Sequence, residues 1–422
     1  MPDIPVEFIL FALTLIGVAV FHHRTFEVAV TGVITITLYK LLFSEFGDAG
    51  AGVAGLAGHL KHEWVTIANL GGLLLGFALL SSHFEHSRVP KVLPKFLPYD
   101  WRGPLVLLIM VFVLSSFLDN IAAALIGGAM AHTVFNKKVH IGYIAAIVAA
   151  SNAGGSGSVV GDTTTTMMWI DGVAPSQVFH AYVAAGVALF VCGIPASIQQ
   201  NKWSKMTRAT VAAEAIDWVR LLIVVAILAT AIVVNVTVNV KFNEYSDRLP
   251  FLAIGVWAAI LAAAPVRGPD WPALRASIKG TIFLLCLVLS ASMMPVETLP
   301  LPSWQSAMTL GFVSAVFDNI PLTALALDQG GYDWGMLAYT VGFGGSMIWF
   351  GSSAGVAITN LFPEARSVGQ WLRHGWHVTV AYVIGFFVLL TLVGWEPGNK
   401  RKHGVEPGPH KAPVAATANE GK

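Results

Sequence analysis

The sequence predicts an all-α polytopic membrane protein, with about ten to twelve transmembrane helices or half-helices arranged in two structural repeats. Three observations support this fold class. Of the 422 residues, 55% are hydrophobic and only 12% charged, with a mean hydropathy of +0.68, a balance that soluble domains rarely show. The apolar runs are long enough for helical crossings rather than barrel strands. Finally, two polar motifs interrupt these runs, and each motif occurs twice.

The apolar runs give the positions of the predicted spans. The connections at 83–101, 136–138 and 199–208 are basic, which indicates cytoplasmic loops under the positive-inside rule. The N-terminus lacks a basic region, so we expect a first span there and no cleaved signal peptide. The predicted spans lie near 6–22, 25–44, 64–81, 179–197, 219–240, 250–264, 280–294 and 375–394, with polar connections at 241–248 and 267–279.

We expect four parts along the chain, in a multi-pass protein of the cell (inner) membrane. The tail is rich in proline, glycine, alanine and charge, so it is predicted to be disordered and cytoplasmic. The parts are a first repeat with N-terminal spans (1–198), a cytoplasmic linker (199–218), a second repeat (219–395) and the tail (396–422).

The first motif, Ser-x-x-x-Asp-Asn-Ile, occurs at 115–121 and 314–320. No lysine or arginine lies in 103–133 or 304–327 to pair locally with Asp119 or Asp318. An unpaired ionised carboxylate is costly in hydrocarbon, so each should face the protein interior and hold a cation or a proton. The alternative is that each aspartate caps a helix end. Each motif serine lies one helical turn before its aspartate, on the same face. The alternative role for these serines is a hydrogen bond to a backbone carbonyl only.

The second motif, Gly-Gly-Ser-x-x-x-x-Gly-Asp/Ser, occurs at 154–162 and 344–352. Glycines weaken a helix and expose its backbone, which is tolerable at membrane depth only where protein or water surrounds it. We therefore expect hairpins or unwound turns that bring the backbone close to a ligand. For Asp162, the following Thr163–Thr166 run supports helix capping as well as ion ligation.

Interrupted apolar segments in corresponding halves of a chain are typical of transporters built from repeats, with the site at the repeat interface. Carboxylate, amide, hydroxyl and backbone oxygens suit a small, hard cation. Asp119 and Asp162 can also take protons, and a carboxylate cannot hold a sodium ion and a proton at once. The sequence does not decide whether the two halves are inverted relative to each other.

The stretch Ser-Asn-Ala-Gly-Gly-Ser…Gly-Asp-Thr-Thr-Thr-Thr-Met-Met-Trp (151–169), with the Asp-Asn-Ile elements and Gly-Ser-Ser-Ala-Gly-Val-Ala (351–357), resembles the NhaD-type sodium/proton antiporters. Their superfamily also holds arsenite permeases and citrate or dicarboxylate carriers. The resemblance implies helix hairpins, a homodimer and an elevator-type movement. It also implies functional roles for Ser115, Asp119, Asn120, Asn152, Asp162, Thr164, Thr165, Ser314, Asp318, Asn319, Ser346, Ser352 and Ser353.

The predicted ion or substrate site contains these residues together with Gly154, Gly155 and Ser156. The candidate sodium ligands among them are Asp119, Asn120, Asp162, Asp318 and Asn319. No cofactor is expected beyond the transported or coupling sodium ions and protons. The expected partners are an inorganic cation and protons or a small anion, and membrane lipid. The formal net charge of +1 gives no indication of a nucleic-acid partner.

The leading prediction is a secondary transporter that exchanges Na⁺ or Li⁺ for protons by alternating access. A sodium- or proton-coupled carrier of a small anion (citrate or a dicarboxylate, arsenite, bicarbonate) is the alternative, with hydroxyls and helix N-termini binding the oxyanion. The absence of lysine and arginine from both motif regions favours the cation. A non-transporting scaffold subunit is a third possibility. No nucleophile–base pattern or metal-ligand spacing indicates an enzyme.

Overall fold

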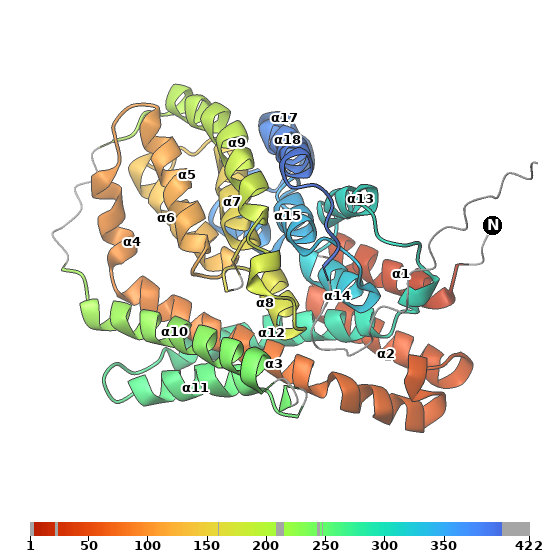
Figure 1. Cartoon of the computed structure of the whole chain (residues 1–422). Coiled ribbons are helices and arrows are strands. Elements are labelled where there is room, and N and C mark those ends of the chain that lie inside the picture. Colours follow the sequence, from red (N-terminus) through yellow and green to blue (C-terminus); the bar gives the residue numbers. More distant parts are fainter. Residues whose placement is uncertain are drawn as a thin grey trace, which may run out of the picture.

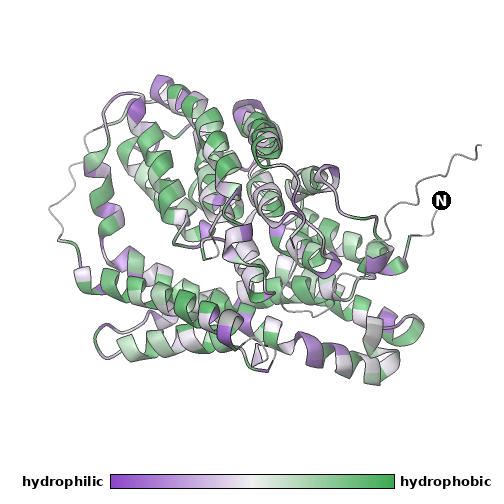
Figure 2. Cartoon of the chain, viewed as in Figure 1, coloured by the Kyte–Doolittle hydropathy of each residue, from purple (hydrophilic) through white to green (hydrophobic). Residues whose placement is uncertain are grey.

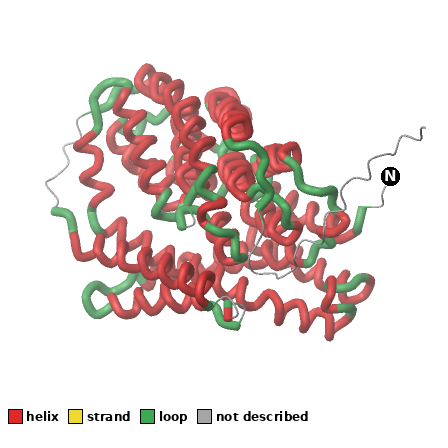
Figure 3. The backbone as a smooth tube through the Cα atoms, viewed as in Figure 1, coloured by secondary structure: helices red, strands yellow, loops and turns green. Residues whose placement is uncertain are grey.

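The computed structural model describes residues 4–21, 24–158, 160–207, 215–242, 245–246 and 248–398, with the backbone alone at residues 48, 239 and 240. In these ranges the regular structure is helical, apart from one isolated bridge between Glu45 and Ala51 (Figure 3). The predicted all-α fold class is therefore confirmed.

The helices form two layers (Figure 1). In the first, which we call the scaffold layer, α3 packs against α10, α11 and α12, while α2 packs against α1 and α12. This layer joins N-terminal helices to helices from the middle of the chain. Its members are α1 (Val6–Val20), α2 (Thr25–Phe43), α3 (Gly52–His86), α10 (Trp218–Lys241), α11 (Phe251–Ala263) and α12 (Trp271–Ser292).

The second layer, which we call the core layer, is built around α7, which is buried from Gly142 to Ser156. The short helix α4 (Val89–Val92) lies between α3 and the core layer in the chain. The core layer comprises α5 (Arg102–Ser115), α6 (Asn120–Val134), α7 (Ile141–Ser156), α8 (Thr163–Ile170), α9 (Ala181–Trp203), α13 (Trp304–Ser314), α14 (Asn319–Gln329), α15 (Trp334–Gly344), α16 (Ser353–Leu361), α17 (Val368–His374) and α18 (Trp376–Leu392).

Among the described residues, five helices are long and apolar enough to cross a membrane: α2, α3, α9, α10 and α12. The pair α17 and α18, bent by 62°, would make a sixth. Other apolar helices, such as α5, α6 and α11, are shorter, as the predicted half-helices require. Apolar residues run along the scaffold helices (Figure 2), and many are exposed, as lipid contact requires.

Several predicted boundaries differ from the structure. Helix α3 begins at Gly52, ahead of the predicted span at 64–81, and α9 continues to Trp203, into the predicted connection 199–208. Sequence 83–86, predicted as a polar connection, continues α3, because its polar groups bond to the scaffold layer: Arg220 Nη1 lies 3.1 Å from His83 Nδ1. The predicted connection 267–279 is helical from Trp271, because the Asp270 side chain accepts a hydrogen bond from Ala273 N (3.1 Å) and so caps α12. Both ends remain polar because they border a cavity.

Helices α5 and α6 form a re-entrant hairpin, since the start of the first and the end of the second lie together. Thr207 N donates to Val134 O at the end of α6 (2.9 Å), while the neighbouring Met206 lies against Gly103 at the start of α5. Helices α13 and α14 form a second hairpin, because Gln329 Nε2 donates to Pro300 O (2.8 Å).

The two hairpins enter the core layer from opposite ends. Near the first hairpin, Gln200 Nε2 donates to Lys138 O (3.1 Å) at one end of α9. At the other end of α9, His180 Nε2 lies 2.6 Å from Asp333 Oδ1, beside the second hairpin. Gln200 lies about 30 Å along α9 from His180. The motif-bearing helices of the two halves are therefore inverted relative to each other, which the sequence left open.

The last described residues lie at the end of the second hairpin. Glu396 N donates to Asp333 Oδ2 (3.1 Å), and Gly398 N donates to Tyr332 O (2.9 Å). Residues 199–207, at the start of the predicted linker, lie at the opposite end of α9. The linker and the start of the tail therefore cannot both be cytoplasmic, although the sequence predicted both to be so. Residues 208–214 of the predicted linker and 399–422 of the predicted tail are outside the described ranges.

Candidate ion-binding site

Four interrupted helices meet in the middle of the core layer. In each, a polar side chain caps the helix that follows the interruption, so the helix begins with a satisfied N–H group. Asp119 accepts from Ile121 N (3.2 Å), Asp162 from Thr164 N (3.0 Å), Asp318 from Ile320 N (3.0 Å) and Ser352 from Gly355 N (3.3 Å). The centre therefore receives both the positive ends of four helices and the carbonyl ends of four others.

The motif serines and glycines hold the interrupted helices in close contact. Ser115 Oγ donates to Ser151 O (2.5 Å), and the matching Ser314 Oγ donates to Val341 O (2.7 Å). The two serines therefore bond to backbone carbonyls, as the alternative interpretation of the sequence had it. A Cβ on Gly154 would lie 2.0 Å from Phe112 O, so only glycine permits this approach.

A buried polar network connects the two halves of the chain. Asn120 Nδ2 donates to Asn152 Oδ1 (3.1 Å) and to Asp162 Oδ2 (3.3 Å). Asn152 Nδ2 in turn donates to Ser346 Oγ (2.9 Å) and Ser352 Oγ (3.1 Å). All five residues are at most 5% exposed. Asn152 thus joins the helix interruption of the first repeat to that of the second.

Asp162 has the capping role that the sequence allowed, and its second oxygen keeps ion ligation possible as well. Its Oδ1 caps α8, while its Oδ2 faces Asn120 and the cavity described below. Asp318 divides its oxygens similarly: Oδ1 caps α14, and Oδ2 accepts from Ser353 Oγ (3.0 Å). Capping and ligation are therefore compatible at these residues, because a carboxylate has two oxygens.

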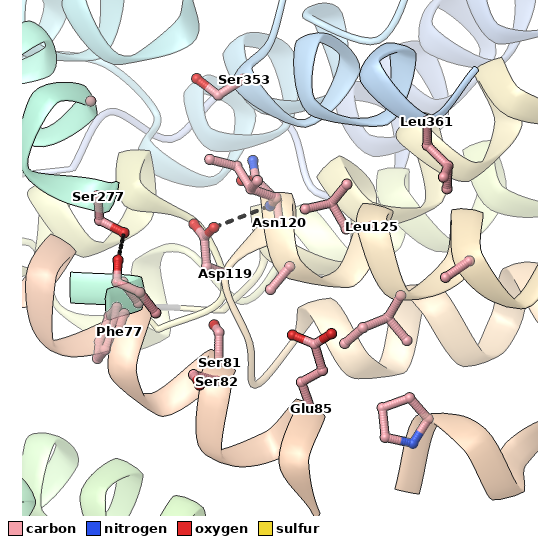
Figure 4. Close-up of a pocket in the computed structure, with 18 of the residues that line it drawn as sticks. Phe77, Ser81, Ser82, Glu85, Asp119, Asn120, Leu125, Ser277, Ser353 and Leu361 are labelled. Carbon is pink, nitrogen blue, oxygen red and sulfur yellow. Dashed lines mark hydrogen bonds between the residues drawn. The ribbon is translucent and has the colours of Figure 1, made fainter. Parts of the chain in front are cut away.

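A cavity of about 1250 Å³ separates this centre from the scaffold layer. Its inner end is lined by Asp119, Asn120, Asp162, Thr163, Asn319 and Ser353, so both Asp-Asn-Ile turns border one chamber. Across it, Ser81, Ser82 and Glu85 of α3 and Ser277 of α12 lie opposite Asp119 and Asn120 (Figure 4). The donors at the inner end are carboxylate, amide and hydroxyl oxygens, which suit a small, hard cation.

The cavity is open at its other end, where the exposed residues Glu85, Lys91 and Asn136 line it. Its charged lining residues are Glu85, Asp119, Asp162 and Asp270 against Lys91. The lining therefore favours cations over anions electrostatically.

The predicted site residues fall into three groups. The cavity is lined by Asp119, Asn120, Asp162, Asn319 and Ser353, and the bonds behind it involve Asn152, Asp318, Ser346 and Ser352. The remaining residues have contacts that support the helix interruptions. Ser156 Oγ donates to Ala153 O, and Thr165 Oγ1 donates to the carbonyls of Ser158 and Asp162. The third group is Ser115, Gly154, Gly155, Ser156, Thr164, Thr165 and Ser314.

The sequence analysis missed two kinds of residue. Gly342 occupies the position that matches Asn152, and a Cβ there would lie 3.6 Å from Asp162 Oδ2; aligning the second motif a few residues further upstream would have found it. The scaffold hydroxyls at the cavity, Ser81, Ser82, Ser277 and Thr281, lie in helices that were predicted only as spans or connections. The spacing of Ser277 and Thr281, one helical turn apart on the same face, was the available signal.

Fold and site together define a polytopic helical membrane protein whose interrupted helices meet at one buried polar centre, an architecture typical of secondary transporters. No family model matches the chain. It is 25% identical over 336 residues to "Sodium/proton antiporter 1" of Arabidopsis thaliana, covering 70% of this chain and 55% of that protein. It is 25% identical over 316 residues to "Na(+)/H(+) antiporter NhaD" of Halomonas elongata, covering 63% of this chain and 62% of that protein. It is 26% identical over 343 residues to "Na(+)/H(+) antiporter NhaD" of Vibrio parahaemolyticus, covering 67% of this chain and 78% of that protein.

The resemblance to NhaD-type antiporters that the motifs predict is confirmed by these relatives. The matched region spans only 55% and 62% of the Arabidopsis and Halomonas proteins.

Proposed function

We propose that the protein is a secondary transporter that exchanges Na⁺ or Li⁺ for protons. One observation carries the proposal: Asp119, Asp162 and both Asp-Asn-Ile turns border a single cavity whose inner end has oxygen donors and no lysine or arginine. The names of the relatives support the same activity. A buried ionisable residue in a membrane protein is by default a functional one.

Competition for the carboxylates gives the exchange. The helix N-termini stabilise Asp119 and Asp162 in the ionised form, and the amide of Asn120 fixes the free oxygen of Asp162. A cation that arrives from the cavity completes its oxygen shell from these groups and displaces any proton that they carry. When the site faces the other side, protonation of the carboxylates releases the cation. Cation movement in one direction is therefore coupled to proton movement in the other.

Alternating access would use the boundary between the two layers. The cavity lies between α6 of the core layer and α3 and α12 of the scaffold layer, and it opens beside Asn136 and the basic connection 136–138. The positive-inside rule favours this end as cytoplasmic. With this orientation the cavity is open to the cytoplasm and the linker is cytoplasmic, in line with the prediction. The start of the tail then faces the opposite side of the membrane, which differs from the predicted cytoplasmic tail. The homodimer remains a prediction.

Transport in everted vesicles or proteoliposomes tests the proposal. Addition of NaCl or LiCl should dissipate a preset pH gradient, and the Asp119→Asn variant should be inactive while reaching the membrane in normal amount. KCl serves as the control cation. A pH gradient that survives sodium and lithium would overturn the proposal.

An anion carrier stays the second candidate, because four helix N-termini point at the cavity and such ends bind oxyanions. Three of those ends are already capped by aspartates, which would repel an anion unless sodium bound first. Sodium-dependent uptake of labelled citrate, arsenite or bicarbonate, without dissipation of the pH gradient, would establish this candidate instead.

A further inference from the structure

Two histidines meet at the end of the core layer where the cavity opens. His140 precedes α7, His374 ends α17, and their ring centroids are 5.0 Å apart with planes at 84°. His140 Nδ1 accepts from Gly142 N (3.2 Å), so this ring also caps the helix that carries Asn152. The ring pair therefore lies at the joint between a buried central helix and a short peripheral one.

The backbone at this joint is tightly packed. A Cβ on Gly142 would lie 2.3 Å from His374 O, and one on Gly375 would lie 3.0 Å from Ala145 Cβ. The bend of 62° between α17 and α18 occurs at this point. Little space remains for the rings to separate unless α17 moves away from α7.

A direct path leads from α17 to the polar network. Trp371, one turn before His374, is fully buried, and its Nε1 donates to Ser346 O (3.2 Å). Ser346 Oγ accepts the hydrogen bond from Asn152 Nδ2, and Asn152 bonds to Asn120. A displacement of α17 would therefore change the position of Ser346 and the bonds that Asn152 makes.

The other charged and titratable groups around the pair are mostly cationic. They are Lys137 and Lys138 before α7, Lys202 on α9, Arg373 on α17, His377 on α18 and, as the one carboxylate, Glu364 in the 3₁₀ turn Pro363–Ala365 that packs on α7. Among the ion pairs of the described ranges, none joins either ring to a carboxylate. A second proton on the pair would therefore be opposed by like charge.

We propose that His140 and His374 form a proton sensor that adjusts the ion site through Trp371. The proposal rests on the proposed function for its physiological meaning, since it names a regulation of the same site. Protons at the cavity end would loosen the contact of α17 with α7 and disturb Ser346 and Asn152, which lowers the rate of exchange.

The sign follows from proton linkage. Burial and the neighbouring His374 ring lower the pKa of His140 below its usual value. The packed arrangement thus binds fewer protons at His140 than one with the rings apart, where an unperturbed imidazole has a pKa of about 6.5. The packed arrangement is favoured above this pH and is progressively lost below it.

The first test measures exchange in everted vesicles, where the medium sets the pH at the proposed cytoplasmic end. Sodium-dependent exchange is recorded from pH 6 to 9 for wild type, His374→Gln and Trp371→Phe, with His132→Gln as the control. His132 lies at the end of α6, and its ring contacts that of Phe362 edge-on instead. His374→Gln and Trp371→Phe should each shift the acid limb of the pH profile by at least about half a pH unit, which corresponds to about a threefold change in rate at acid pH. The control should leave the profile unchanged.

The second test follows His140 without transport. The Trp203 ring centroid lies 5.6 Å from that of His140, and a protonated imidazole quenches indole fluorescence. The difference in fluorescence between wild type and Trp203→Phe should titrate in the purified protein, and His374→Gln should raise the midpoint because it removes the repulsion.

The outcomes separate the two proposals. A fluorescence titration that shifts with His374→Gln in a protein without sodium/proton exchange would support the histidine pair and reject the proposed function. Exchange with identical pH profiles in wild type, His374→Gln and Trp371→Phe would reject the sensor and leave the proposed function intact. Absence of any titration between pH 5 and 8 would also reject the sensor.

Discussion

The two repeats share a backbone but not a chemistry. Ser115 and Ser314 make the same bond to matching carbonyls, and Asp119 and Asp318 cap matching helices. At two positions near the cavity they differ: the first repeat has Asn152 and Asp162, and the second has Gly342 and Ser352. At these positions the first repeat thus supplies charge and an amide, and the second supplies a hydroxyl and a backbone without a side chain.

Under the proposed function, this difference favours one shared ion site over two equivalent ones. A Cβ on Gly342 would stand 3.6 Å from both Asp162 Oδ2 and Ser156 Cβ, so the missing side chain lets the backbone of the second repeat lie close to this carboxylate. Asn152 uses its amide to hold Ser346 and Ser352 of the second repeat. The second repeat therefore serves as a wall of the site whose charge comes mainly from the first.

The largest effects are expected where a carboxylate that lines the cavity is lost, as in Asp162→Asn, which keeps the shape of the side chain. Loss of one partner of a buried charge contact costs about 3 kcal/mol or more, so sodium/proton exchange should fall by about 100-fold or more. Ser352→Ala at the matching position should retain exchange within about tenfold, because only hydrogen bonds are lost. Equal losses in both variants, measured in vesicles with matched protein amounts, would contradict the asymmetry.

The pair Asp119→Asn and Asp318→Asn is expected to differ in the same direction. Asp119 lines the cavity, whereas one oxygen of Asp318 is engaged by Ser353. Asp119→Asn should abolish measurable exchange, and Asp318→Asn should mainly raise the apparent KM for sodium. A retained rate in Asp119→Asn would reduce that residue to its capping role.

The shared backbone predicts equal stability losses for Ser115→Ala and Ser314→Ala. Each substitution leaves a buried carbonyl without its donor, which costs about 1–3 kcal/mol. Thermal unfolding of the purified variants in detergent measures this loss. A large difference between the two would show that the repeats are not equivalent even in their supporting bonds.

Gly342 tests the close approach of the second repeat to Asp162 directly. Gly342→Ala places a methyl group at ordinary contact distance and should raise the apparent KM for sodium by only about twofold to threefold, whereas the larger side chain of Gly342→Leu should crowd Asp162 and raise it further. Sodium titrations at constant pH distinguish the two. Equal values for wild type and Gly342→Leu would mean that the ion does not use this side of Asp162.

The smallest effect is expected at the exposed scaffold side of the cavity. Glu85→Gln should raise the apparent KM for sodium by roughly twofold at low ionic strength and leave it unchanged in high salt, because exposed charges steer ions and are screened. An effect that persists in high salt would instead assign Glu85 to direct binding.

Much of the fold could be predicted because lipid imposes a simple requirement on sequence. Apolar runs located α1, α2, α10, α11 and α18 closely, and the polar motifs located the four helix interruptions. The end of α3 and the start of α12 were missed because a helix that borders an aqueous cavity has the composition of a loop. The hairpin direction of α5 and α6 depends on contacts such as Thr207 with Val134, which no local pattern contains.

The site could be predicted only as a set of candidates. Carboxylates and amides in apolar surroundings identified Asp119, Asn120 and Asp162, since their burial needs a reason. The pattern could not distinguish a serine that faces an ion from one that faces a carbonyl, and Ser115 has the second role in the structure. Gly342 contributes by having no side chain, and a missing group leaves no chemical signal.

The depth of the cavity has an electrical consequence. Because it opens the protein from one compartment as far as Asp119 and Asp162, that compartment's potential extends to the middle of the molecule. A membrane voltage then falls mainly over the protein beyond these residues instead of over about 30 Å of hydrocarbon. An elementary charge moved across this thinner barrier exchanges about 2.3 kcal/mol per 100 mV, so a short displacement is enough to make turnover voltage-dependent.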